Sequence, residues 1–152
     1  NQRMNKLGAA GVALMAALAA GNLVAAEAAG TVKTVRGAVT VERGSQKVAA
    51  VPGMRVEAAD RIATGPDGSV GITLRDQTML TAGPNSLLGL DKYSFDSTTH
   101  GGELDANLKR GSLAVISGKL AKASPESVRF RTDSVTLGVR GTEFILEAAG
   151  GQ

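Results

Sequence analysis

Short runs in which apolar and polar residues alternate, separated by glycine- and proline-rich turns, are the feature of this sequence that most restricts its fold. Alternation with a period of two is typical of strands that bury one face. Strands at intervals of about ten residues, bounded by such turns, indicate a sandwich or a barrel. We therefore predict one all-β domain of short, mostly antiparallel strands, either a sandwich or a β-roll, with a short β-helix as the alternative. The runs cover residues 31–43, 69–75, 78–82, 86–93, 111–117, 127–132, 134–139 and 142–147.

The spacing within each run also predicts which side chains face inward. Val32 is out of phase with the residues that follow it, which indicates a bulge near Lys33 and Thr34. Asp76 and Gln77 occupy the place of a two-residue hairpin turn, but without glycine a type I′ turn is disfavoured. Residues 111–117 are apolar on both faces and predict a central strand, and 118–123 predict a short helical turn. The expected inward residues are Val35, Gly37, Val39, Val41, Val70, Ile72, Leu74, Leu88, Leu90, Val128, Phe130, Val135, Leu137, Val139, Phe144 and Leu146.

The first 28 residues have the pattern of a secretory signal peptide. Basic Arg3 and Lys6 precede an uncharged apolar stretch at 7–20, and small residues at Ala26 and Ala28 suit a signal peptidase. We therefore predict a signal-peptide helix over 1–28, cleaved near Ala28, and a periplasmic protein. The β domain is expected over 30–147 and a disordered tail over 148–152. No later apolar run approaches the ~18 residues of a membrane span, so no stable span is expected after cleavage.

The composition narrows the possible chemistry. The chain has no cysteine and one histidine, which excludes disulfides, a thiolate nucleophile and a multi-histidine metal site within one chain. His100 lies in a glycine-containing loop, and the acid pairs Asp91 with Asp96 and Glu103 with Asp105 are read as solvated loop residues rather than a hydrolase pair. We therefore expect no catalytic residues, no metal and no cofactor, and we predict that the protein is not an enzyme.

Three glycine-containing stretches are more distinctive than the rest. The first, 60–70 (DRIATGPDGSV), reads as a tight turn that feeds a strand, with Asp60 and Thr64 able to bond backbone groups and Arg61 able to pair with Asp60 or a cross-strand acid. The second, 83–86 (GPNS), is a similar turn. The third is 138–144 (GVRGTEF), where glycines on both sides of Arg140 suit a buried, hydrogen-bonded guanidinium or an exposed anion contact.

In their order and spacing, and with Ser117-Gly118-Lys119 between them, these stretches resemble the FecR domain of bacterial envelope proteins. The resemblance covers about residues 30–147, although that family usually has glycine after the aspartate at position 76, where this chain has Gln77. We call the residues that carry it the signature residues. They are Asp60, Arg61, Thr64, Gly65, Pro66, Gly68, Asp76, Thr78, Gly83, Asn85, Ser86, Ser117, Gly118, Arg140, Gly141, Thr142 and Phe144.

The resemblance implies a β-rich domain in the periplasm of a Gram-negative bacterium. The regulator that gives the family its name joins the signal of an outer-membrane transducer to a cytoplasmic anti-sigma segment. In this sequence we expect the predicted signal peptide to stand in place of the cytoplasmic and membrane-spanning regions. The chain therefore resembles stand-alone, exported FecR-like proteins that lack the anti-sigma and transmembrane regions.

Two functions follow as expectations. The first is a non-enzymatic protein-interaction or envelope-sensing and signalling module, which docks an envelope protein through an exposed strand edge. The alternative is a structural binder of cell-wall polymer, or of another anionic envelope ligand, through a basic strand face. That face would comprise Lys109, Arg110, Arg129 and Arg131. Nucleic acid is not expected as a partner, because the export signal and the scarcity of aromatic residues argue against it.

Overall fold

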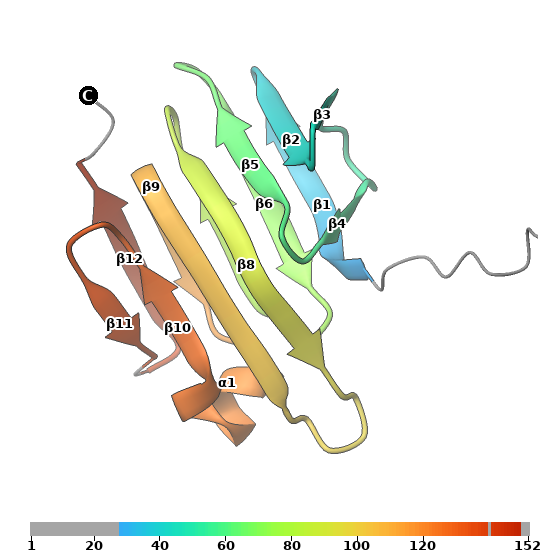
Figure 1. The fold of residues 1–152 in the computed structure, drawn as a ribbon, viewed down its shortest axis with the longest axis vertical. Coiled ribbons are helices and arrows are strands. Elements are labelled where there is room, and N and C mark those ends of the chain that lie inside the picture. Colours follow the sequence, from blue (N-terminus) through green and yellow to red (C-terminus); the bar gives the residue numbers. More distant parts are fainter. Residues whose placement is uncertain (1–27, 140, 150–152) are drawn as a thin grey trace, which may run out of the picture.

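The computed structural model describes residues 28–139 and 141–149, and the predicted signal peptide lies outside this part except for Ala28. Twelve strands form one sheet that curls into a half-barrel (Figure 1). The elements are β1 (Ala28–Arg36), β2 (Val39–Arg43), β3 (Gln46–Ala49), β4 (Arg55–Glu57), β5 (Arg61–Thr64), β6 (Ser69–Leu74), β7 (Met79–Ala82), β8 (Leu87–Phe95), β9 (Gly102–Ile116), α1 (Lys119–Ala123), the 3-10 helix η2 (Pro125–Ser127), β10 (Val128–Arg131), β11 (Thr136–Gly138) and β12 (Glu143–Ala148).

The long strand β9 divides the sheet into two limbs. Residues 102–110 of β9 pair with β8, and part of this segment pairs with β10. Residues 111–116 pair with β12, and most of them also pair with β7. The first limb has the order β3-β2-β5-β8-β9-β10-β11, and the second has the order β4-β1-β6-β7-β9-β12. The first limb lies in front of the second in Figure 1. The all-β, mostly antiparallel prediction is confirmed, since β9–β10 is the one parallel pair among the described strands.

The core lies between the two limbs and is built by the alternation seen in the sequence. Val70, Ile72 and Leu74 of β6 are buried in turn, with intervening residues half-buried. Val128 and Phe130 of β10 are likewise buried as predicted. At about 25 cal/mol per Å², burial of each large apolar side chain stabilises the fold by roughly 1.5–3 kcal/mol. The predicted central strand is confirmed, because residues 113–116 have hydrogen-bonded neighbours on both sides.

The predicted strand over 31–43 is two strands. Gly37 has a φ of +61° and turns the chain between β1 in the second limb and β2 in the first, so the prediction that it faces inward is wrong. The predicted bulge near Lys33 and Thr34 is confirmed, because the register of β1 against β6 shifts between Val32 and Thr34. The bulge explains why Val32 is fully buried although it is out of phase with Val35.

The hairpin after β6 has a three-residue loop rather than the predicted two-residue turn. The Leu74 N–H donates to the Thr78 carbonyl at 2.8 Å, and the Gln77 N–H donates to the Leu74 carbonyl at 2.9 Å. Gln77 adopts a φ of +77°. A turn followed by one left-handed residue is the usual three-residue hairpin loop. Gln77 therefore occupies the left-handed position of the loop, where glycine is favoured.

Other differences lie near the ends of the described chain and at its edges. The run 134–139 forms only the short strand β11, in which Leu137 packs on the core, whereas Val135 is exposed and does not face inward as predicted. Ala148, expected in the tail, is the last residue of β12. The short helical turn near 118–123 is present as α1. Within the described residues, no helix has the length and apolarity needed to cross a membrane.

Candidate functional site

The first two signature stretches meet around the hydroxyl of Thr64, which is buried. This hydroxyl donates to the Gly83 carbonyl at 2.6 Å and accepts the Ser86 N–H at 2.8 Å. The Thr64 N–H donates to the Ser86 carbonyl at 2.9 Å, and the Asn85 N–H donates to the Gly65 carbonyl at 3.0 Å. The two turns are therefore joined by side-chain and backbone bonds into one unit, which we call the double-turn cluster.

Ser86 connects the double-turn cluster to β9. Its hydroxyl donates to the Ser112 carbonyl at 3.2 Å and accepts the Ser112 N–H at 3.0 Å. The preceding residue, Gly111, has a φ of +91°. A Cβ at this position would come within 2.5 Å of the Ser86 Cα, so the close approach of β9 to the turn requires glycine.

The turn glycines of the first stretch pack against the chain between β1 and β2. The Gly65 N–H donates to the Ala38 carbonyl at 2.9 Å, and the Gly68 N–H donates to the Gly65 carbonyl at 3.0 Å. Gly68 is buried, and a Cβ there would come within 2.5 Å of the Ala38 carbonyl oxygen. Pro66, by contrast, is exposed at the tip of the turn. These signature residues therefore shape the backbone.

Asp60 is 1% exposed and pairs with Arg43 of β2. The Arg43 Nε and Nη2 atoms donate to its two carboxylate oxygens at 2.9 and 2.7 Å, and the Glu57 N–H donates to Asp60 Oδ2 at 2.8 Å. The hydrogen bond to Asp60 raises the pKa of Arg43. Arg61, for which the sequence suggested Asp60 or a cross-strand acid as partner, instead lies on the exposed side of β5. Arg43 follows the buried Val39 and Val41 at a period of two, and this spacing was the available signal for it.

The second buried carboxylate, Asp76, joins three separate elements. Its Oδ2 accepts the Thr78 hydroxyl at 2.8 Å and the Leu120 N–H, near the start of α1, at 2.9 Å. Its Oδ1 accepts the Tyr93 hydroxyl at 2.8 Å. Gly118 permits this approach, because a Cβ there would collide with the Asp76 carbonyl and the Thr78 N–H. Asp76, Thr78 and Gly118 therefore act together as a buried structural junction between the hairpin, β8 and α1.

Tyr93, which sequence reasoning did not single out, completes this junction. Burial, followed by the hydrogen bond to Asp76, raises the pKa of Tyr93 far above its ordinary value. The Arg75 guanidinium lies over the Tyr93 ring, 5.6 Å from its centroid, and donates to the carbonyls of Ala28 and Phe95 at 2.6 and 3.0 Å. Tyr93 is the single tyrosine of the chain, and no local motif around it indicated this role.

The last signature residues lie where β9 ends and β12 begins. The Ser117 N–H donates to the Thr142 carbonyl at 2.7 Å, and its hydroxyl donates to the Gly141 carbonyl at 3.3 Å. The Phe144 ring meets the buried Phe130 ring edge to face, with centroids 5.3 Å apart. Arg140 lies outside the described residues, so its expected role stays a prediction.

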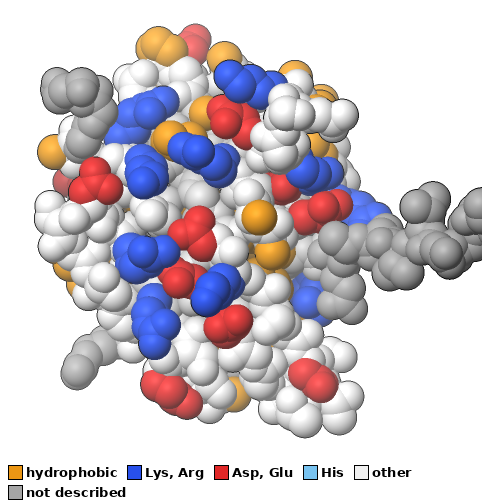
Figure 2. All heavy atoms as spheres, viewed as in Figure 1, with side chains coloured by type: hydrophobic (Ala, Val, Ile, Leu, Met, Phe, Trp, Pro, Cys, Tyr) orange, Lys and Arg blue, Asp and Glu red, His pale blue; other side chains and the backbone are white. Residues whose placement is uncertain are grey.

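The proposed basic face is interrupted by acids. Arg129 and Arg131 alternate with the buried residues of β10, as expected. Arg131, however, donates to Asp105 at 2.9 Å and to Asp91 at 2.8 Å, and the bond to Asp105 raises its pKa. Figure 2 shows basic and acidic side chains interleaved over this face of the molecule. The charge of Arg131 is balanced by Asp91 and Asp105. Arg129 and Lys109 are exposed, and Arg110 is half-buried.

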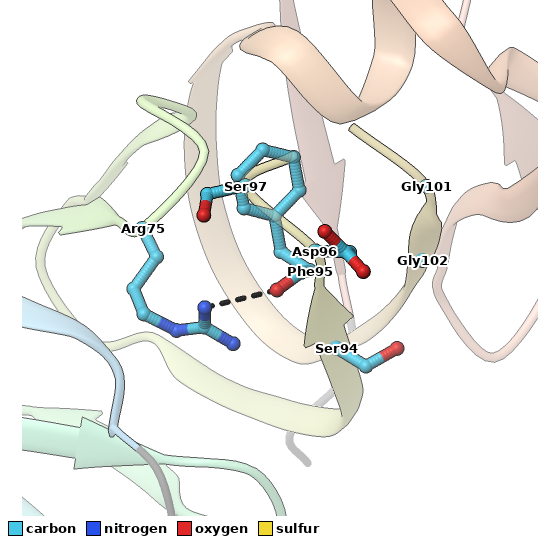
Figure 3. A pocket seen from close by; sticks show the side chains of 7 residues that line it. All are labelled: Arg75, Ser94, Phe95, Asp96, Ser97, Gly101 and Gly102. Carbon is cyan, nitrogen blue, oxygen red and sulfur yellow. Dashed lines mark hydrogen bonds between the residues drawn. The ribbon is translucent and has the colours of Figure 1, made fainter. Parts of the chain in front are cut away.

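An open, mostly polar pocket lies beside the 96–101 loop (Figure 3). Arg75, Phe95 and Asp96 contribute to its lining, and His100 stacks on Phe95 with ring centroids 5.8 Å apart. Backbone N–H groups of Thr98 and Thr99 hold the pKa of Asp96 below its ordinary value. Asp96 therefore stays ionised near neutral pH and is unsuited to general acid catalysis. Among the described residues, no three His, Cys, Asp or Glu side chains gather to hold a metal ion.

The strongest candidate for a binding surface is β12, which sequence reasoning treated only as a core strand. Within the described chain, β12 pairs with β9 alone, so its other edge presents unpaired N–H and C=O groups. Ile145 on its outer face is 70% exposed. The register places Ile145 opposite Ala114 of β9. Two residues further along the same face of β9, Ile116 lies opposite Met79 of β7, and both side chains are exposed. A shallow apolar groove lined by Ile116, Phe144 and Ile145 follows this surface.

A second groove opens between β11 and β12. Leu137 of β11, together with Phe144 and Ile145 of β12, forms its apolar lining. Like β12, β11 pairs on one side only within the described residues. We define the β12 edge surface as the free edge of β12 together with three exposed apolar residues: Ile145 of β12, Ile116 of β9 and Met79 of β7.

Comparison with protein families places residues 60–152 within a family described as FecR protein. Comparison with curated proteins and with solved structures gave no match. The matched region begins at Asp60, which pairs with Arg43 of β2, and β5 within it is hydrogen-bonded to β2. The strands before residue 60 therefore belong to the same folded sheet.

Proposed function

Because this chain belongs to the FecR family, a family of regulatory and signalling proteins, we propose that it acts as a non-enzymatic protein-interaction module for sensing or signalling in the bacterial envelope. The module binds another envelope protein and transforms no substrate. The proposed location is the periplasm. The signal-peptide pattern of residues 1–28 supports that location.

One observation supports the docking function above the others: the β12 edge surface combines unpaired backbone groups with exposed apolar side chains. A free edge accepts an added strand through main-chain hydrogen bonds. Natural proteins usually protect such an edge from other chains, whereas here Ile145 is the most exposed of the large apolar side chains in the described part. A partner strand on β12 pairs with the unpaired backbone groups of the edge and brings its side chains beside Ile145.

The buried signature residues have a structural role that is separate from docking. Asp60, Thr64, Asp76, Thr78 and Ser86 are buried and bonded within the domain, so they stabilise the fold and are not available to a partner. The docking surface is therefore formed by residues outside the buried part of the family pattern. This arrangement allows one scaffold to carry different partners on its edges.

Photo-crosslinking in cells tests the proposal. A photoreactive amino acid replaces Ile145 in the full chain, and a matched control places it at Val48, an exposed residue of the opposite edge strand β3. We expect Ile145 to capture a discrete envelope protein and Val48 to capture none. No captured protein from Ile145, or the same capture from both positions, contradicts the proposal.

The cell-wall alternative rests on Lys109 and Arg129, which are exposed on the first limb. Neutralisation of Arg131 by Asp91 and Asp105 lowers the net charge of that face, which favours protein docking over polymer binding. Purified peptidoglycan sacculi discriminate the two functions. Sedimentation of the chain with sacculi, abolished by Lys109→Glu with Arg129→Glu, supports the alternative, whereas no sedimentation removes it.

A further inference from the structure

We infer that the partner of the β12 edge surface is an extended segment of another protein with the order basic, apolar, apolar, apolar, basic. The inference rests on the proposed docking function and adds the chemistry of the partner. It is carried by two acidic residues that flank the exposed isoleucine on β12.

The outer face of β12 carries Glu143, Ile145 and Glu147 in sequence. These three residues are exposed, while Phe144 is half-buried and Leu146 is buried on the other face. The strand β9 places Ile116, Ala114 and Ser112 opposite them, so no cation of β9 lies directly opposite either glutamate. Within the described part of the chain, neither glutamate takes part in an ion pair.

The other side of β12 is the free edge, where an added antiparallel strand would place its residues directly opposite those of β12. Side chains in such pairs lie about 4.5–5.5 Å apart at Cβ, and opposite charges there are favourable. Lysine or arginine opposite Glu143 and Glu147 satisfies both acids. An apolar residue opposite Ile145 joins the exposed apolar group, and apolar residues opposite Phe144 and Leu146 face the groove beside Leu137.

The same geometry argues against a second copy of this chain as the occupant. In a symmetric antiparallel pair centred on Ile145, each Glu143 lies opposite a Glu147 of the other copy. Shifting the register by two residues in either direction places a glutamate opposite Ile145. Like charges in direct opposition destabilise the centred register, and each shifted register leaves Ile145 opposite a charged side chain, so none of these three registers matches the outer faces.

Acidic residues on an edge also serve as protection against aggregation, and a charge-exchange experiment separates that role from partner selection. Two labelled synthetic peptides share one apolar core of three residues, flanked by lysines in one and by glutamates in the other. Binding to the full chain is measured by fluorescence anisotropy. We expect the lysine peptide to bind at least about fivefold more tightly at low salt, and the difference to shrink at high salt.

The Glu143→Lys, Glu147→Lys double variant should reverse the preference of the chain, and Glu126→Lys, on the exposed helix η2, should leave it unchanged. Circular dichroism checks that each variant keeps its β structure. Equal binding of the two peptides overturns the charge rule while leaving the docking proposal in place. Binding of neither peptide, or self-association of the chain through β12, overturns the inference. The docking proposal itself fails on the cell experiment, if Ile145 captures no protein or captures the same protein as Val48.

Discussion

The hydroxyl of Tyr93 donates a 2.8 Å hydrogen bond to the carboxylate of Asp76, a side chain with 0% exposure. The same hydroxyl accepts the Asp76 N–H at 3.0 Å. This contact links β8 to the hairpin between β6 and β7, and through the other Asp76 oxygen to α1. One carboxylate therefore holds together segments that are far apart in the sequence.

Tyr93 should make the stability of the fold sensitive to alkaline pH. Its pKa is raised above the ordinary value of 10.0 in the folded chain, so folding favours the neutral phenol. The stabilisation is complete below about pH 10 and is lost as the pH rises from there toward the folded pKa. Ultraviolet absorbance titration follows this single tyrosine directly. Ionisation at its ordinary pKa in the folded protein would contradict the buried contact.

Removal of the Tyr93 hydroxyl should destabilise the domain at neutral pH. Tyr93→Phe leaves a buried Asp76 oxygen and the Asp76 N–H without this partner, which costs about 1–3 kcal/mol. Urea unfolding followed by circular dichroism measures the change. Ser94→Ala, on the exposed face of β8, is the matched control. Its effect should stay within about 0.5 kcal/mol.

Arg43 should matter more than Arg61, which the sequence suggested could pair with Asp60 or a cross-strand acid. Arg43→Ala leaves the buried Asp60 carboxylate without its cation. Loss of one partner of a buried pair costs about 3–5 kcal/mol, and the 39% exposure of the Arg43 side chain lowers that figure to about 2–3 kcal/mol. Arg61→Ala should change the free energy of unfolding by less than about 0.5 kcal/mol. Equal effects of the two substitutions would show that the pairing is not the one described.

Gly111 should not tolerate alanine, because its φ is +91° and a Cβ there meets Ser86. We expect Gly111→Ala to lower the free energy of unfolding by more than about 1 kcal/mol, since alanine is strained at positive φ. Gly138→Ala is the control, because no atom lies within 4 Å of a Cβ at that position. Thermal unfolding of both variants compares them. A Gly111→Ala protein as stable as the control would refute the close approach of β9 to the double-turn cluster.

Phe130→Asp should prevent folding. Phe130 is 1% exposed, and a buried, unpaired carboxylate costs several kcal/mol against a total stability of about 5–15 kcal/mol. Arg129→Asp, on the exposed face of the same strand, should keep the native circular dichroism spectrum. Native spectra from both variants would mean that β10 does not contribute Phe130 to the core.

The sequence predicted those parts of the fold in which local alternation coincides with burial. The strands around Val70, Phe130 and Leu146 follow that rule and were found where expected. The strand β3 was missed because all four of its residues are exposed and carry no alternation of burial. The first part of β9 was also missed, although Leu104, Ala106 and Leu108 alternate with polar residues, because its weakly apolar alanine and its charges resembled a loop.

The site was less predictable because its contacts join residues far apart in the chain. Asp76 and Leu120 are 44 positions apart, and Ser86 and Ser112 are 26 apart. Residue type alone suggested that Asp60 and Thr64 bind backbone, but it could not identify Arg43 or Tyr93 as partners. The exposure of Ile145 was equally hidden, because a strand at the rim of a sheet has the same local pattern as one inside it.

A single strand shared by both limbs has mechanical and thermodynamic consequences. Since β9 supplies hydrogen-bonding neighbours to β8 and β10 in one limb and to β7 and β12 in the other, neither limb can open alone without exposing the backbone of the other. Unfolding should therefore be cooperative, with similar hydrogen-exchange protection in both limbs. A protein that binds the free edge of β12 contacts a strand that is hydrogen-bonded directly to β9. Force applied at this edge is therefore transmitted to the first limb through the continuous backbone of β9.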